Sequence, residues 1–303
     1  MSSAYIAVDL SALPAPQIVD PLDFDTIFAD MLAQLISLDS TFTALVESDP
    51  AYKILQVAAY REVLLRQRVN EAAQALLLAY AEDGDLDQIA AGFDVERLTI
   101  TPADNTTVPP TPAVMELDDA LRARVQQSFE GFTSAGPVGA YQFFALSSSG
   151  LVLDVSVTSP TPGTVQVTLL HANGDGGADN DPNGTLLNAV TAALSAENVR
   201  PLCDTVVVAF ATILPYSVNA TLEIDASVDQ DAVLAMSQSN MQAYADSVHK
   251  CGGAPTLAGV YAALWATGVQ NVVLNAGGIQ ADMVADKTEA SYCTGITIAG
   301  EAV

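Results

Sequence analysis

A single long apolar repeat constrains the fold of this chain more than any other feature of its sequence. Between Asp49 and Tyr80, small and aliphatic residues recur at seven-residue intervals, and Asp49 followed by Pro50 is a pair that commonly begins a helix. A helix over this range would extend about 45 Å, which is longer than most helices that only cover a compact core. We therefore predict one long amphipathic helix that packs against a partner along its length.

The residues of this repeat form the candidate interface, which we call the seam. Glu62 interrupts the repeat, and Arg61, Arg66 and Arg68 place three of the ten basic residues of the chain close to it. These arginines either pair with acids on a partner helix or another subunit, or form a solvated face of the helix, and the sequence does not separate the two. The apolar members of the seam are Leu55, Ala58, Leu65, Val69, Ala72 and Leu76.

The periodicity of apolar residues changes along the chain and predicts an α+β fold. A shorter helix that begins at Asp20 and Pro21 precedes the long one. From Leu151 onwards the apolar residues alternate, so Leu153, Val155 and Val157 are predicted to face the same side of a β-hairpin. A helical N-terminal region is therefore followed by small α/β sandwich units.

The domain boundaries follow from the same changes in pattern. We predict a helical bundle region over residues 1–100 and a linker over residues 101–116, since that segment is rich in proline and threonine. Helices with a β-β-α-β unit then occupy residues 117–212, and a second small α/β unit occupies residues 213–303.

Composition and charge exclude several classes of function. A net charge of −26 repels phosphate backbones, which disfavours nucleic acid as a partner. The stretch from Cys251 to Ala281 has no charged residue, but its glycines, asparagines and Pro255 divide it into pieces too short to span a membrane. The three cysteines are widely spaced, which predicts free thiols in a reducing compartment, and the N-terminus lacks the pattern of a secretory signal.

Motifs for catalysis or metal binding are weak. In the loop from Asn173 to Gly184, Asp179, Asp181 and Asn183 match the first half of a calcium-binding loop, but Val190 stands where the pattern needs a glutamate, so a solvated loop is the stronger interpretation. His249 and Cys251 form a single His-x-Cys pair, which is too few ligands for zinc. The sequence has no P-loop, nucleophile elbow or dinucleotide-binding fingerprint. We predict no catalytic residues, no cofactor and no metal site.

Longer strings of sequence resemble the baseplate J-like family of contractile phage tails. They occur in the family's order and extend over nearly the whole chain. These strings are LSALPAPQIVDPLDFDTIFADMLAQL (10–35), YREVLLRQRVNEAA (60–73), DLDQIAAGFDVERLTITPA (85–103), FEGFTSAGPVGAY (129–141), VSVTSPTPG (155–163), VRPLCDTV (199–206) and DKTEASYC (286–293).

This resemblance implies a structural wedge subunit of the tail baseplate that has no catalytic residues. It implies that the chain pairs with sister copies and with a tail protein I-like wedge chain through long helices. It also implies contact with a small sheath-initiating wedge protein, through which rearrangement of the baseplate reaches the sheath. Such a protein would be assembled in the bacterial host cytoplasm and would reside in the virion tail baseplate. The alternatives are a soluble carbohydrate-binding or carbohydrate-processing protein that uses the acidic loops, and an adhesin-like binding module.

Overall fold

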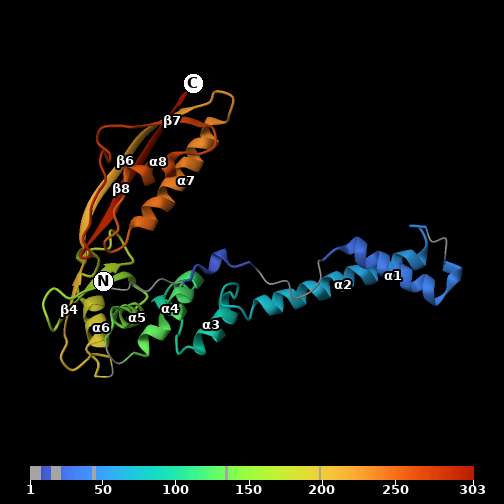
Figure 1. Cartoon of the computed structure of the whole chain (residues 1–303), viewed down its shortest axis with the longest axis horizontal. Helices are drawn as coiled ribbons and strands as arrows, with labels where there is room; N and C mark the ends of the chain where they lie inside the picture. Colours follow the sequence, from blue (N-terminus) through green and yellow to red (C-terminus); the bar gives the residue numbers. More distant parts are fainter. Residues whose placement is uncertain (1–7, 15–21, 43–45, 134–135, 198) are drawn as a thin grey trace. The chain divides into compact units, whose positions relative to one another are not determined.

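The computed structural model describes residues 8–14, 22–42, 46–133, 136–197 and 199–303 (Figure 1). The chain divides into two compact units. We call Ala7–Glu96 with Asp118–Val125 the helical unit, and Arg97–Leu117 with Gln126–Val303 the sheet unit. The α+β class predicted from the sequence, with its helical N-terminal region, is confirmed.

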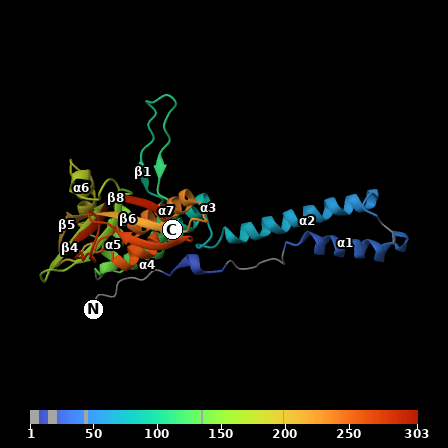
Figure 2. The same ribbon diagram turned by 90° about the horizontal axis from the view of Figure 1, so that it is seen from above.

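The helical unit contains α1 (Phe24–Leu38), α2 (Pro50–Gln74), α3 (Asp83–Ala91) and the first half of α4 (Asp118–Gly131), with short 3-10 turns at Leu10–Ala12 and Ser40–Phe42. Asp23 caps α1, because its carboxylate accepts the N–H of Asp25. The predicted start at Asp20 and Pro21 lies outside the described residues. α1 packs against α2 (Figures 1 and 2), with Ile27 buried and the ring of Phe28 edge-on to Tyr52 at 4.8 Å.

The long helix begins where the sequence predicts but ends earlier. α2 starts at Pro50, although the side chain of Asp49 makes no capping hydrogen bond. It ends at Gln74 instead of Tyr80, and the following residues form turns in which the N–H groups of Tyr80 and Ala81 both bond to the carbonyl of Leu77. The prediction of one helix up to Tyr80 was therefore wrong, and Leu76 lies in the turn after α2.

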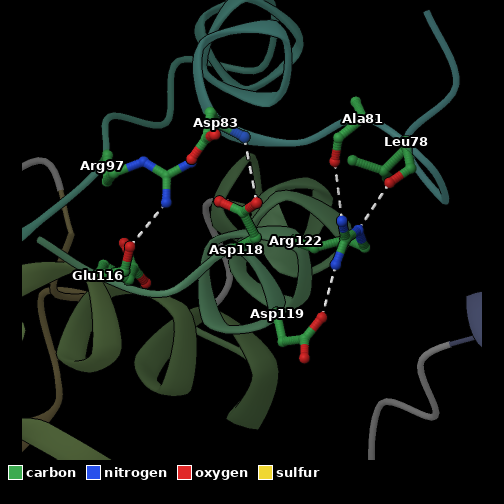
Figure 3. A network of polar contacts seen from close by, with 8 residues as sticks. All are labelled: Leu78, Ala81, Asp83, Arg97, Glu116, Asp118, Asp119 and Arg122. Carbon is green, nitrogen blue, oxygen red and sulfur yellow. Dashed lines mark hydrogen bonds and ion pairs between the residues drawn. The ribbon is translucent and has the colours of Figure 1, made fainter. Parts of the chain in front are cut away.

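Arg122 of α4 stabilises the turns that follow this early end. Its guanidinium donates to the carbonyl of Leu78 at 2.8 Å and to that of Ala81 at 2.9 Å (Figure 3). In a continuing helix these carbonyls would accept N–H groups four residues further along the chain. The guanidinium of Arg122 donates hydrogen bonds to them instead. Both carbonyls are therefore paired although the helix does not continue.

In the sheet unit, the segment predicted as a linker has a definite structure. Strands β1 (Thr99–Thr101) and β2 (Val114–Met115) pair antiparallel, and Asp104 pairs with Thr111 further out. At the base, Arg97 donates to the carbonyl of Glu116 at 2.7 Å (Figure 3). We call residues 99–115 the arm, and Figure 2 shows this hairpin extending away from the sheets of its own unit.

The first sheet, together with the helices that pack on it, contains the predicted β-β-α-β unit. Strands β3 (Val152–Thr158), β4 (Thr164–His171) and β5 (Thr205–Phe210) lie in the order β3-β4-β5, antiparallel and then parallel. α5 (Val138–Ser148) and α6 (Thr185–Leu194) pack on the sheet. The predicted hairpin is confirmed, but Leu153 is 46% exposed and does not share the buried face of Val155 and Val157. The register shifts between Val152 and Asp154, and such an irregularity turns one side chain outward.

The second sheet contains the longest strands and is also covered by helices. The sheet has the order β7-β6-β8, from β6 (Thr212–Ile224), β7 (Val269–Leu274) and β8 (Glu289–Ala302), with β6 antiparallel to β7 and parallel to β8. Alternate residues of β6 from Tyr216 to Ile224 are buried in a core shared with α7 (Gln230–Val248) and α8 (Leu257–Leu264). The uncharged stretch after Cys251 thus forms α8 and β7. Within the described residues, every helix is too short or too polar to cross a lipid bilayer.

Candidate assembly interface

The side of α2 that is turned away from α1 is unusually apolar for a solvent-exposed surface. Ala59, on the opposite side of the helix, is fully buried. We call the apolar side chains on the exposed side the α2 stripe. They are Ile54 (69% exposed), Val57 (63%), Tyr60 (58%), Leu64 (41%), Leu65 (60%) and Val69 (52%).

The predicted seam overlaps this stripe only in part. Ala58, Leu65, Val69 and Ala72 are exposed on it, whereas Leu55 is half-buried toward the inner side. Leu76 is 79% exposed but lies beyond the end of α2.

The seven-residue repeat missed Ile54, Val57, Tyr60 and Leu64. These four residues are spaced by three and four positions, so they lie along one side of a helix, and that spacing was visible in the sequence. A strict heptad describes a narrow contact with one partner, whereas the observed stripe is broader.

The charged residues around the stripe separate into two groups. Glu62 and Arg66 bond to each other within α2, with 2.9 Å between Oε1 and Nε. Arg61 and Arg68 lie on the exposed side, and neither has an acidic partner among the residues that the structure describes. The helix therefore presents an apolar surface crossed by two unpaired positive charges.

Comparison with known proteins assigns the chain to a family. The model of the baseplate J-like N-terminal domain matches residues 47–104, which include all of α2, and the model of the baseplate J-like central domain matches residues 133–210. Over 294 residues the chain is 46% identical to baseplate protein J of Escherichia phage P2, and the match covers 95% of each chain. The chain belongs to the baseplate J-like family. It is a structural protein of the phage tail baseplate, as the longer sequence strings implied.

The acidic loop of this baseplate J-like chain uses its carboxylates to hold its own backbone. Asp181 accepts the N–H groups of Thr185 at 2.8 Å and Leu187 at 3.0 Å at the start of α6. Asp175 accepts from the N–H of Gly177 at 3.0 Å, and Asn180 donates to the same oxygen at 2.7 Å. These hydrogen bonds hold the pKa of Asp175 and Asp181 below their usual range. No group of three or more potential metal ligands occurs within the described ranges. The carboxylates of Asp175 and Asp181 bond the backbone of their own loop, so they give no support to the alternative of a carbohydrate-binding protein.

Removal of divalent cations is expected to leave the stability of this baseplate J-like protein unchanged, because the loop is held by hydrogen bonds within the chain. A thermal melt in EDTA should give a midpoint within about 1 °C of the melt in calcium, since only a bound ligand shifts the midpoint. A higher midpoint in calcium that EDTA reverses would contradict this prediction.

The three cysteines of the baseplate J-like chain have different surroundings. Cys203 is exposed. Cys251 donates its backbone N–H to Asp154 at 2.8 Å, and burial raises the pKa of its thiol to about 12, with a further contribution from the Asp154 carboxylate. Burial also raises the pKa of the Cys293 thiol. The half-buried thiols of Cys251 and Cys293 are therefore expected to react slowly, because only the thiolate reacts readily.

Thiol titration is expected to resolve these surroundings. At pH 8 only about one in ten thousand thiols of pKa about 12 is ionised, so Cys251 should react with an aromatic disulfide reagent at least about 100-fold more slowly than the exposed Cys203. Cys203→Ser should remove the fast phase alone, and unfolding in urea should make the remaining thiols reactive. A fast phase that persists in Cys203→Ser would show that the thiol of Cys251 or Cys293 is open to solvent.

Proposed function

We propose that this chain is a wedge subunit of a contractile tail baseplate and that the α2 stripe is its contact with partner helices. The partners are a sister copy and a tail protein I-like wedge chain. The observation that carries the proposal is the exposed apolar stripe on the longest helix of the chain. The family membership supports the same role, because it places the chain in the baseplate.

The energetics favour a partner on the α2 stripe. Fully burying a Val, Leu or Ile side chain stabilises by roughly 1.5–3 kcal/mol, so covering six side chains that are about half exposed favours association by several kcal/mol before the costs of binding. Water would otherwise contact this surface continuously. Contiguous exposed apolar surface of this kind is typical of interaction sites.

The charges indicate the chemistry of the partner surface. α2 contains four of the ten basic residues of the chain and only Glu62 and Glu71 as acids, while the whole chain has a net charge of −26. α2 is therefore a basic segment in an acidic protein. We expect Arg61 and Arg68 to meet acidic side chains of the partner, which would fix the register of the helices.

The wedge role includes a mechanical function. In this proposal the helix bundle joins wedges around the central hub. When the baseplate rearranges, the change is passed to a small sheath-initiating wedge protein, which starts sheath contraction. The chain acts through contacts rather than through a reaction. Its surface is made for protein neighbours, as the stripe and the acidic charge indicate.

Co-expression with the co-encoded tail proteins tests the proposal. An affinity tag on this chain should recover a stoichiometric complex that contains the tail protein I-like chain, and native mass spectrometry should give its copy numbers. Recovery of this chain as a lone monomer from every co-expression would refute the wedge proposal.

A further inference from the structure

The arm is an ordered hairpin that the rest of the sheet unit does not cover. Every residue from 101 to 112 is exposed, and Val108 at the tip is 98% exposed. Local bonds give it shape: Asp104 accepts both the N–H of Thr106 at 2.8 Å and its hydroxyl at 2.6 Å, which holds the pKa of the Asp104 carboxyl below its usual range. The hydroxyls of Thr107 and Thr111 lie 3.0 Å apart across the hairpin.

An exposed and internally bonded hairpin is well suited to binding. Two-stranded hairpins are only marginally stable in water without a third element against them. Proline fixes backbone angles before binding, and the arm has Pro102, Pro109, Pro110 and Pro112, so little conformational entropy remains to be lost when a partner covers it. Asp104 is its only charged residue.

A segment without charged residues contributes exposed aromatic side chains to the part of the sheet unit that contains α7 and α8. The stretch from Cys251 to Ala281 contains no charge, although 15% of the chain is charged. On α8 and just after it, Tyr261 is 37% exposed and Trp265, the one tryptophan of the chain, is 53% exposed. Exposed tryptophan and tyrosine side chains are the residues that most often carry binding energy at interfaces.

The arm and this aromatic surface are chemically complementary. Proline-rich segments are commonly recognised by surfaces lined with aromatic rings. Charge narrows the choice of partner, because two copies of a chain with a charge of −26 repel each other except where their contacting surfaces are nearly neutral. Both segments are nearly neutral, since the arm carries a single acid and α8 with Trp265 carries none, although Asp282 accepts the N–H of Leu257 at 2.7 Å at the start of that helix.

We propose that the arm of one copy packs against the Tyr261–Trp265 surface of a sister copy in the assembled baseplate. This inference rests on the proposed assembly with sister copies and adds a second contact, separate from the α2 stripe. Two different surfaces meet in it, so the contact can be made reciprocally within a two-fold pair or repeated head-to-tail from copy to copy around an axis. A neighbour of different sequence on the arm would be the competing outcome of the test.

Site-specific photocrosslinking in the full chain tests this contact. The photoreactive residue p-benzoylphenylalanine replaces Val108, and equal amounts of chain with ordinary and with heavy nitrogen are mixed at high concentration before illumination. The expected product is a crosslink to the tryptic peptide between Lys250 and Lys287 that contains one light and one heavy partner. Products confined to a single isotope, or no dimer at all, would overturn the inference. The same substitution at Leu202, which is 95% exposed on another loop, is the matched control and should give little of this product.

Substitutions should confirm which side chains form the contact. Trp265→Ala is expected to lower the yield of the mixed-isotope crosslink about tenfold, as expected for an aromatic hot spot. Tyr261→Ala should lower it less, since this ring is less exposed. Far-ultraviolet circular dichroism verifies that each variant is folded. An undiminished yield in the folded Trp265→Ala variant would overturn the assignment of the aromatic surface.

The design separates this inference from the wedge proposal. The crosslink is measured in the purified chain, and a variant with a polar α2 stripe should still form it. One outcome is that the wild-type chain binds its tail partners and yet gives no mixed-isotope crosslink, either as the purified chain or in the purified complex. In that case the inference fails and the wedge proposal stands. A crosslink from position 108 to a co-purified tail protein instead of the sister copy would also overturn it.

Discussion

Aspartate at both Leu65 and Val69 is expected to abolish co-purification of this chain with its tail partners while leaving the chain folded. Both side chains are exposed, at 60% and 52%, and substitutions at exposed positions usually change stability by no more than about 0.5 kcal/mol. Once a partner covers the stripe, each carboxylate would be buried against apolar side chains, and pairing with Arg61 or Arg68 would take these arginines away from the acids of the partner. The loss at a hot spot is about 2 kcal/mol or more, so the pair should weaken binding more than about 100-fold.

Two further variants make this result interpretable. Glutamine at the same two positions keeps a helix propensity close to that of leucine, so a loss of binding in that variant reflects the polar surface rather than a damaged helix. Val284→Asp, at a position that is 84% exposed in the sheet unit, controls for added negative charge and should bind normally. Pull-down yield and a thermal melt are measured for all three. Full recovery of the complex with both double variants would show that the α2 stripe is not the interface.

The sequence predicted those parts of the fold that depend on local periodicity. Pro50 marks the start of α2, and the alternation around Val155 and Val157 marks the hairpin of β3 and β4. In both cases the residues that carry the pattern also make the local structure, through a fixed φ angle or a buried face. The same holds for the exposed face of α2, where apolar residues at seven-residue intervals identified part of the α2 stripe and the broader spacing of three and four positions would have added Ile54 and Leu64.

Features that depend on distant residues could not be predicted in this way. Nothing in the residues after Gln74 disfavours a helix, and the turns that follow α2 are held by a distant side chain, since Arg122, 44 positions after Leu78, bonds the carbonyl of Leu78. The arm is a similar case, since proline and threonine usually indicate a linker. Its shape depends on hydrogen bonds across the hairpin, such as the pair of Asp104 and Thr111, which composition does not reveal.

Loss of the Arg122 side chain is expected to destabilise the helical unit strongly. The side chain is 14% exposed and its guanidinium bonds the carbonyls of Leu78 and Ala81 as well as Asp119 at 2.6 Å. Arg122→Ala leaves both carbonyls without their charged donor, and each unsatisfied group costs about 1–3 kcal/mol. We therefore expect the free energy of unfolding of this unit to fall by about 2–4 kcal/mol, measured by urea denaturation followed by far-ultraviolet circular dichroism.

Asp119 allows the ion pair to be distinguished from the carbonyl bonds. Its side chain is 98% exposed, so its ion pair with Arg122 is weak in water, and Asp119→Ala should cost less than about 1 kcal/mol. Arg122→Lys keeps the charge but cannot reach two carbonyls with a planar fork, and most of the loss should persist. Equal losses in Asp119→Ala and Arg122→Ala, or full stability in Arg122→Lys, would mean that charge, rather than the two bonds to backbone carbonyls, stabilises the turns after α2. The expected order, with arginine indispensable and aspartate dispensable, would show that the turns after α2 are stabilised by hydrogen bonds from α4.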